Sequence, residues 1–404
     1  YTPIMHPNRS RWTVPVLAFF ALVLVAGGIW ANLYFAETSP GGEEFLTYWN
    51  GLRSWFLQGV SPYNLAVQLD TEMMAFGHPA QAGEPRLVCV SPLYSALILF
   101  PFALISEYSI ARAFWMIILE LALIATIILS VRLMDWKPSR WTWVFLVLFT
   151  WMSAYSFHSI LSGSPAAIVG LFIVLALTAL RNGRHELAGL LLALATCFPL
   201  SLSLLVILIL FWALISRKGL VALWLVAGVL ILSVIGLFFI VDWPLQMVRS
   251  YIPSSSAQAM LTFGDVLTAW LPGIGKQLSG GWIILLILVL LVEWILARQK
   301  DHRWLVWVVC LTLVLQMCSG MPTRLSYTVI LLIPLVQILA NWEQRLDKVG
   351  QWLASSSLVF LLVAGWLMVW ANFEDWFRME ILPIETWGMI LLFIAFLIVG
   401  LYWV

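Results

Sequence analysis

The part of this chain best suited to chemistry is an acidic, polar stretch that interrupts an otherwise apolar sequence. It spans residues 36–107, and its front segment, 41–49, reads Gly-Gly-Glu-Glu-Phe-Leu-Thr-Tyr-Trp. Carboxylates at the exit of a membrane helix are costly to place beside lipid, so they are candidates for function. Glu44 and Tyr48 fit one side of a helix along the membrane plane, where a carboxylate suits a general base that takes a proton from an acceptor hydroxyl. Alternatively, Glu43 and Glu44 only stabilise the positive N-terminal end of that helix, and composition favours neither interpretation.

The composition predicts the elements that must position these residues. The chain is 62% hydrophobic and 10% charged, which is far from the composition of a soluble domain. Its repeated apolar runs of about 18 to 25 residues match the thickness of a bilayer, and lipid leaves the backbone no partners except those within a helix. We therefore expect an all-α, polytopic membrane protein in which residues 1–404 form one domain. The net charge of +1 and the lack of a basic run give no sign of a nucleic-acid partner.

The loop charges predict the topology. Fourteen of the 21 basic residues fall in loops that the positive-inside rule places in the cytoplasm together with both termini. Both ends of 186–216 are then cytoplasmic, so this segment must cross twice, with a break near Pro199. The segment 87–105, with Pro92 and Pro101, is expected to be a short interfacial or re-entrant helix on the outer side. About twelve crossing helices in a cell membrane are expected, at 12–35, 108–131, 141–160, 165–181, 186–197, 199–216, 219–241, 281–298, 304–319, 322–341, 350–371 and 384–404.

Two outer loops, 36–107 and 242–280, are expected to cover a site at the outer membrane surface. Serine and glycine residues in the second loop predict a flexible cover, although an ordinary linker has the same composition. The outer side also offers cations for an anionic substrate. The basic residues expected there are Arg53, Arg86, Arg112, Arg249, Lys276, Arg324 and Arg378.

Three of the outer residues are candidates for binding a phosphate. Arg324 follows Pro322 at a helix end, where its planar fork could bind a phosphate with two hydrogen bonds. Arg249 is the second candidate, in the second outer loop. His158 is the third, because it ends the third predicted helix beside a Ser-Gly-Ser-Pro turn. The alternative for each is an interfacial residue that anchors a helix end among lipid headgroups.

Several motifs in order along the chain resemble glycosyltransferase family 87, the polyprenyl-phosphate-mannose-dependent relatives within the GT-C superfamily. The first is the acidic-Phe-x-x-Tyr-Trp stretch that ends at Trp49, followed by Gly-Val-Ser-Pro-Tyr at 59–63. The others are Val-Ser-Pro-Leu-Tyr at 90–94, His-Ser-Ile-Leu-Ser-Gly-Ser at 158–164, Arg-Asn-Gly-Arg-His-Glu-Leu-Ala-Gly-Leu at 181–190 and Ser-Gly-Met-Pro-Thr-Arg-Leu-Ser-Tyr at 319–327.

The resemblance implies a mechanism that uses a lipid-linked sugar as substrate and no cofactor, and no metal is expected because the acidic residues lack an obvious paired ligand set. A hexose, mannose above all, moves from a polyprenyl-phosphate lipid to an acceptor hydroxyl on the extracytoplasmic side, with inversion at the anomeric carbon. Carried over, Glu44 is the general base, and membrane lipids surround the site. Residues expected to bind the sugar or the acceptor are Glu43, Tyr48, Trp49, Tyr63 and Tyr94.

The chain also departs from the family pattern. Glu44 stands where the family usually has aspartate, Ser164 follows Gly163 in place of glutamine, and Phe198 replaces a frequent lysine. Arg324 or Ser326 takes the place of a usual histidine. These departures keep open a second interpretation, in which the chain is a catalytically silent GT-C-like subunit of a larger membrane complex with protein partners. A transporter, which predicts related halves, ranks last, because no internal repeat is evident.

Overall fold

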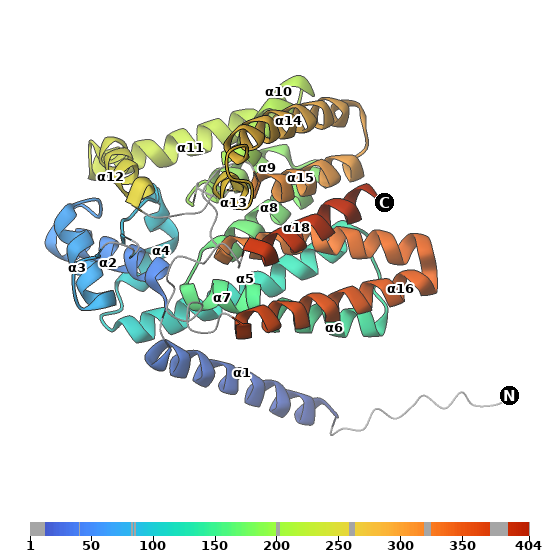
Figure 1. Cartoon of the computed structure of the whole chain (residues 1–404). Coiled ribbons are helices and arrows are strands. Elements are labelled where there is room, and N and C mark those ends of the chain that lie inside the picture. Colours follow the sequence, from blue (N-terminus) through green and yellow to red (C-terminus); the bar gives the residue numbers. More distant parts are fainter. Residues whose placement is uncertain are drawn as a thin grey trace.

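The computed structural model describes an all-α protein, which confirms the predicted fold class. It describes residues 13–39, 41–81, 84, 86–198, 203–257, 263–318, 325–371 and 387–403. Within these ranges all regular structure is helical. Figure 1 shows the long helices running in roughly one direction, with α1 along one side of the bundle.

The first half of the chain supplies the outer helices and the centre of the bundle. Helix α5 packs against α1, α6, α8 and α16, which makes it the central element. The bounds are α1 Thr13–Thr38, α2 Glu43–Gln58, α3 Leu65–Phe76, the 3-10 helix η1 Leu93–Ser95, α4 Ala96–Ala103, α5 Tyr108–Leu133, α6 Arg140–Met152, α7 Ala154–Ser162, α8 Ala166–Arg181 and α9 His185–Ala195.

The second half packs around this centre. Helix α16 contains a sharp reversal at Asp347, where φ is 47° and ψ is −119°, so it is a hairpin of two antiparallel helices. The bounds are α10 Ser203–Ile215, α11 Gly219–Phe239, α12 Trp243–Ala257, α13 Phe263–Trp270, α14 Gly275–Leu296, the 3-10 helices η3 Ala297–Gln299 and η4 Leu325–Leu331, α15 His302–Gln316, α16 Leu332–Ala371 and α18 Trp387–Tyr402.

Most of the predicted crossing segments correspond to helices within a few residues. Among the described residues, five helical stretches are long and apolar enough to cross a membrane, and the remaining apolar helices are shorter. The number of crossings therefore stays a prediction. The five are Tyr108–Leu133, Arg140–Ser162, Gly219–Phe239, Gly275–Gln299 and Leu325–Leu367.

The basic loops gather at one end of the bundle, which we call the basic end. Arg181 binds the carboxylate of Asp135 with both nitrogen-to-oxygen distances below 3 Å, which joins the α5–α6 loop to the end of α8. His302, at the start of α15, lies within electrostatic reach of both Arg181 and Lys218. Glu343 accepts a 2.9 Å hydrogen bond from the Trp136 indole and so ties α16 to the same end. This grouping agrees with the charge-based topology.

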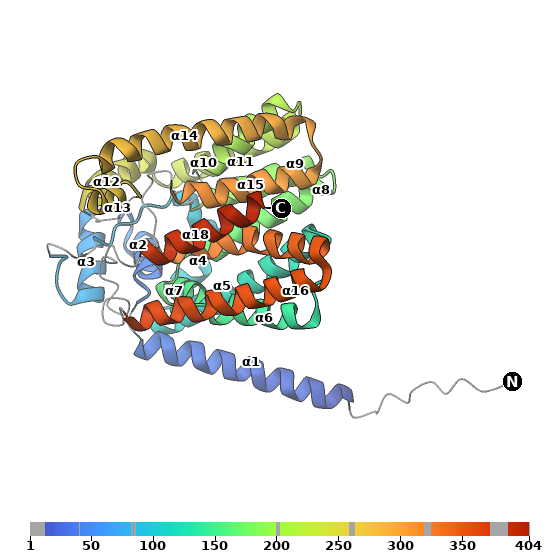
Figure 2. The same cartoon turned by 45° about the vertical axis from the view of Figure 1, so that its right-hand side comes forward.

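The opposite end, which we call the site end, carries the two predicted outer loops. Figure 2 shows α3 lying across the direction of the long helices, as a helix along the membrane plane would. The short helix expected within 87–105 is present as η1 and α4, although Pro101 lies inside α4 instead of bounding it.

Two segments differ in form from what the sequence indicates. Most of the described part of 242–280 is helical and not an irregular linker, because α12, α13 and the first turns of α14 occupy it, and its movement as a cover stays a prediction. The third predicted helix is divided at Ser153, whose backbone is extended and whose hydroxyl caps α7 by accepting a hydrogen bond from Ser156 N. A serine in a helical run supports a new helix start in this way.

Candidate functional site

Glu44 lies in the first turn of α2, at the site end. The helix follows Gly42, whose φ of 88° is a backbone conformation that glycine adopts without strain. The Glu44 side chain is only 8% exposed, and its Oε1 atom accepts a 2.7 Å hydrogen bond from the hydroxyl of Ser326. Ser326 is buried in η4, 282 residues further along the chain. The structure thus joins the first outer loop to the segment that enters the α16 hairpin.

Helix α5 holds the turn that leads into α2. The Tyr108 hydroxyl donates a 2.8 Å hydrogen bond to the carbonyl oxygen of Gly42. A Cβ atom at Gly42 would lie 2.5 Å from that hydroxyl and 2.6 Å from Nε of Arg112. Only glycine fits there without a shift of its neighbours, so the backbone two residues before Glu44 is in close contact with α5.

Arg112 connects this turn to α7. It is 2% exposed, and its guanidinium donates to the carbonyl oxygens of Ala36 at 3.4 Å and Ser39 at 3.0 Å, at the end of α1. It also donates to the carbonyl oxygen of Leu161, in the last turn of α7, at 2.9 Å. Its charge is therefore directed at main-chain oxygens of two separate turns.

Helix α7 approaches α2 at Gly163. This residue has a φ of 71° and would place a Cβ atom 2.5 Å from Cβ of Phe45. The Phe45 ring stacks on Trp115 with centroids 5.4 Å apart, and the Trp115 indole donates a 2.8 Å hydrogen bond to the Gly163 carbonyl oxygen. Phe45 follows Glu44 directly, so this packing fixes the backbone that carries the carboxylate.

Tyr48 and Tyr94 both contact the residues that follow the C-terminal end of α9. The buried Tyr48 ring lies 5.8 Å from the ring of Phe198, which is itself buried. The half-buried Tyr94 donates from its hydroxyl to the carbonyl oxygen of Thr196 at 3.2 Å. Phe198, at the position of the expected lysine, thus completes an apolar contact. A role of the two tyrosines in sugar binding stays a prediction.

Tyr63 is buried on the α2–α3 connection, and its hydroxyl donates to the carbonyl oxygen of Ser91 at 2.8 Å. Burial raises the pKa of this phenol, so Tyr63 is a hydrogen-bond donor and not a base. The space between Tyr48, Tyr63 and the 89–95 segment is too narrow for a water molecule. In this conformation the rings of Tyr48 and Tyr63 pack the α2–α3 region against the 89–95 segment.

Trp49 is accounted for by packing. It is 5% exposed, its indole donates to the carbonyl oxygen of Ile105 at 3.2 Å, and its ring lies 5.3 Å from that of Tyr108. Arg53 lies over the same indole at 5.4 Å and donates to the Ala103 and Ile105 carbonyl oxygens. The predicted stacking of a sugar on Trp49 gains no support from this geometry.

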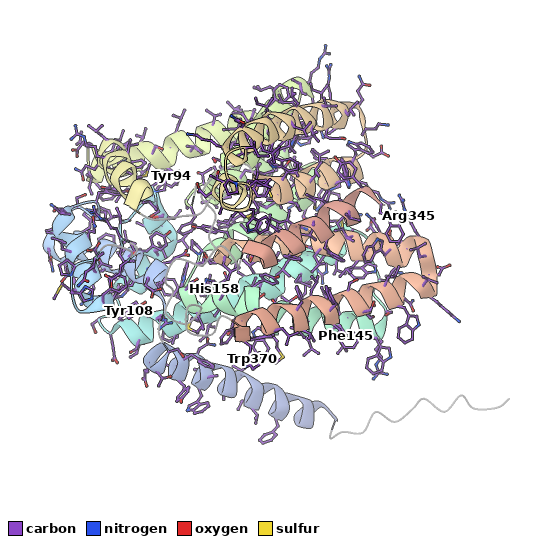
Figure 3. The ribbon with its side chains drawn as sticks, viewed as in Figure 1. Tyr94, Tyr108, Phe145, His158, Arg345 and Trp370 are labelled. Carbon is purple, nitrogen blue, oxygen red and sulfur yellow. The ribbon has the colours of Figure 1, made fainter. Side chains whose placement is uncertain are left out.

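The candidate phosphate ligands have different outcomes. Arg324 lies outside the described residues, two positions before Ser326 in the chain. Arg249 is exposed on α12, whose next residue, Ser250, donates to the carbonyl oxygen of Tyr63 at 3.2 Å. The two segments predicted as outer loops therefore touch, and their role as a shared cover stays a prediction. His158 is buried within α7 and does not end the helix, which continues to Ser162. Figure 3 shows His158 and Tyr108 toward the site end, away from Arg345 at the basic end.

Sequence reasoning missed the roles of Ser326 and Arg112. Ser326 stood out only as a replacement for a usual histidine, and its partner lies far away in the chain. Arg112 was one of seven outer cations without an assigned role. An arginine one turn inside an apolar helix is a signal of a specific partner, but the sequence does not show whether that partner is a ligand or the backbone.

A further cavity lies beside this region, between α13 and the start of α14. It has a volume of about 610 Å³ and a mainly apolar lining. Hydrocarbon would be a suitable occupant, since burying apolar surface there is favourable. The lining residues are Phe263, Leu267, Ile274, Gln277, Leu278, Gly281, Trp282 and Leu285.

Comparison with known families supplies the decisive observation. The model of glycosyltransferase family 87 matches residues 91–322, more than half of the chain. The chain belongs to glycosyltransferase family 87. No curated protein and no solved structure matches it.

Family membership makes this a glycosyltransferase with the character of a helical membrane protein. The matched segment includes α5, α7, α8 and α9, which form the scaffold of the site. It begins after α2 and ends before η4, so neither Glu44 nor Ser326 lies within it. The roles of these two residues therefore depend on their own geometry.

Proposed function

We propose that this chain transfers a hexose, mannose in the first instance, from a polyprenyl-phosphate donor to a hydroxyl acceptor, with Glu44 as the general base. The observation that carries the proposal is the buried Glu44 carboxylate, fixed by Ser326 at the site end of a family 87 scaffold. The site end faces the extracytoplasmic side, because the basic loops gather at the other end. The chain then spans a cell membrane several times, with both termini in the cytoplasm.

The proposed reaction is an inverting displacement without a cofactor. Glu44 accepts the proton of the acceptor hydroxyl as its oxygen attacks the anomeric carbon. The bond between that carbon and the phosphate oxygen breaks, and the polyprenyl phosphate departs with the electron pair. Arg249 and Arg324, with His158, are the proposed phosphate ligands. The apolar cavity between α13 and α14 is suited to part of the prenyl chain.

The test replaces each carboxylate separately. The protein in nanodiscs is given polyprenyl-phosphate hexoses with mannose, glucose or galactose and a panel of glycoside acceptors, and released polyprenyl phosphate is measured by mass spectrometry. Glu44→Gln is expected to abolish release while the protein remains folded. Glu43→Gln is the matched control, since it removes the same charge one residue away, and it is expected to raise the KM for acceptor and leave kcat largely intact. Full activity of a folded Glu44→Gln enzyme would exclude Glu44 as the base.

A second candidate function is the silent subunit of a membrane complex. It is favoured by the burial of two departures from the family pattern, because Phe198 is 4% exposed and Ser164 is 0% exposed, so both serve packing. This alternative predicts that the purified chain releases no polyprenyl phosphate from any donor and co-purifies with partners in fixed ratio. Turnover by the isolated chain would exclude it.

A further inference from the structure

One face of α5 carries three hydrogen-bond donors directed at the backbone of two other segments. Tyr108, Arg112 and Trp115 follow the i, i+4, i+7 spacing that places side chains on the same side of a helix. Tyr108 binds the carbonyl at the start of α2, and Trp115 binds the carbonyl that ends α7. Arg112, between them, binds the carbonyls of Ala36 and Ser39 at the end of α1 and that of Leu161 in the last turn of α7.

The Arg112 contacts span the connection that leads to Glu44. Two of its acceptors, the carbonyl oxygens of Ala36 and Ser39, precede α2, and its third, that of Leu161, is in α7. The planar guanidinium of arginine can donate hydrogen bonds in several fixed directions at once, whereas the ammonium of lysine is a compact point charge on a flexible side chain. Arginine therefore sets the relative placement of these turns in a way that lysine would not.

Ser326, the hydrogen-bond partner of Glu44, is positioned by helix α7. The 3-10 helix η4, which carries Ser326, packs against α7. The carboxylate of Glu44 and the hydroxyl of Ser326 thus come from segments that adjoin the two places bound by Arg112, the end of α1 and the last turn of α7. Because η4 packs against α7, an error in the spacing of α2 and α7 would disturb the 2.7 Å hydrogen bond from Ser326 to Glu44.

We propose that Arg112 is a positioning residue of the transferase, which fixes the first turn of α2 against α7 so that Glu44 meets its acceptor in the required place. The inference assigns the Arg112 charge to the backbone and not to the donor phosphate. It rests on the proposed role of Glu44. A misplacement of about 1 Å in a catalytic group can lower the rate about a hundredfold.

The first test compares two arginines that both donate hydrogen bonds to main-chain carbonyl oxygens, at different distances from Glu44. Arg112→Lys retains the charge and loses the fork. Arg53→Lys is the matched control, because Arg53 also donates to two carbonyl oxygens but lies nine residues after Glu44, about 14 Å along the axis of α2. We expect Arg112→Lys to lower kcat between about tenfold and a hundredfold, with KM for the donor within twofold. Arg53→Lys is expected to lower kcat less than threefold.

The second test does not depend on activity. Hydrogen exchange is followed by mass spectrometry on peptides that cover the first turn of α2. Arg112→Lys is expected to speed the exchange of the amides of residues 43–47, and Arg53→Lys is expected to leave them as in the wild type. If Arg112→Lys does not fold, Tyr108→Phe serves in its place, because it removes the single hydroxyl of α5 that binds the Gly42 carbonyl before α2. It is expected to speed exchange of the same amides, with a smaller loss of kcat.

The outcomes separate this inference from the proposed function. Equal kcat losses in the two lysine variants, a loss confined to the KM for donor, or unchanged exchange in the α2 turn would each overturn the positioning role. A KM effect alone would instead make Arg112 a donor ligand. If Glu44→Gln is fully active, the proposed base is wrong whatever Arg112 does, and the exchange experiment still decides whether Arg112 orders α2.

Discussion

The contact between α2 and α7 at Gly163 can be tested by adding one methyl group. In Gly163→Ala, the new Cβ atom would lie 2.5 Å from Cβ of Phe45 and 3.4 Å from its backbone nitrogen. Ordinary contacts at such a position begin near 3.4 Å. The two helices must therefore separate by roughly 1 Å, and Phe45 is the residue next to Glu44.

Two terms make up the expected cost. A residue other than glycine with a φ of 71° costs about 1–2 kcal/mol in the left-handed region. Forcing an extra carbon into a packed interior costs about 1–3 kcal/mol more. Gly163→Ala is thus expected to lower the free energy of unfolding by about 2–5 kcal/mol.

Gly183→Ala separates the two terms. Gly183 follows α8 with a φ of 73°, and nothing lies within 4 Å of its added Cβ atom. This variant pays only the backbone term of about 1–2 kcal/mol. The difference between the two alanine variants therefore isolates the contact with Phe45, at about 1–3 kcal/mol.

The assay combines denaturant unfolding in mixed micelles with transferase rates in nanodiscs. Gly163→Ala is expected to lose about a hundredfold in kcat, because its strain displaces Glu44, while Gly183→Ala keeps the wild-type rate per folded molecule. Equal losses of unfolding free energy in the two variants would show that α2 and α7 can accommodate the extra carbon at Gly163 without cost. Wild-type kcat in a folded Gly163→Ala enzyme would refute the idea that this spacing positions the carboxylate.

Three further variants test single interactions. Ser326→Ala removes the charge-assisted hydrogen bond that Ser326 donates to Glu44. Because such a bond contributes about 1.5–3 kcal/mol, its loss is expected to lower kcat about tenfold in the same rate assay. Glu343→Ala leaves the buried donors that it serves at the basic end without an acceptor, so it should cost about 3 kcal/mol or more in unfolding free energy and leave the rate per folded molecule unchanged. Hydrogen bonds from Arg181 lower the pKa of Asp135 below its ordinary value of 3.8, so the pair stabilises the fold above that pH and loses its contribution as pH falls through the lowered value. The unfolding midpoints of wild type and Asp135→Asn should therefore differ slightly at pH 6, because the pair is exposed, and converge once the pH has fallen below the lowered pKa of Asp135.

The helices could be predicted from the sequence because their signal is local. Apolar runs and basic loops indicated the positions of most helix ends. The charge pattern required an even number of crossings between Glu186 and Ser216, and this correctly predicted two separate helices there, α9 and α10. The helices within the second predicted outer loop were missed for a related reason. Its glycines and serines are typical of linkers, but α12 gains partners that sequence does not reveal, such as the Ser61 hydroxyl that donates to Gln246.

The site could be predicted only in part, because its geometry depends on contacts between distant segments. The acidic first turn of α2 was evident from residues 43–49. Its hydrogen bond to Ser326 crosses almost the whole chain. The direction of the Arg112 side chain depends on how α1 and α7 approach α5, and no local pattern encodes that approach.

The paired departures at Glu44 and Ser326 make sense together once they are seen in contact. The resemblance implies a shorter acid at the first position and a usual histidine that is replaced here by Arg324 or Ser326. Here the acid is longer by one methylene and the opposing group is reduced to a hydroxyl, yet the two meet at 2.7 Å. With Ser326 in the place of that histidine, the longer acid and the smaller opposing group offset each other in size. The contact holds the carboxylate in a fixed position, which the proposed role of Glu44 as the base would use; the alternative of a silent subunit makes no such demand on it.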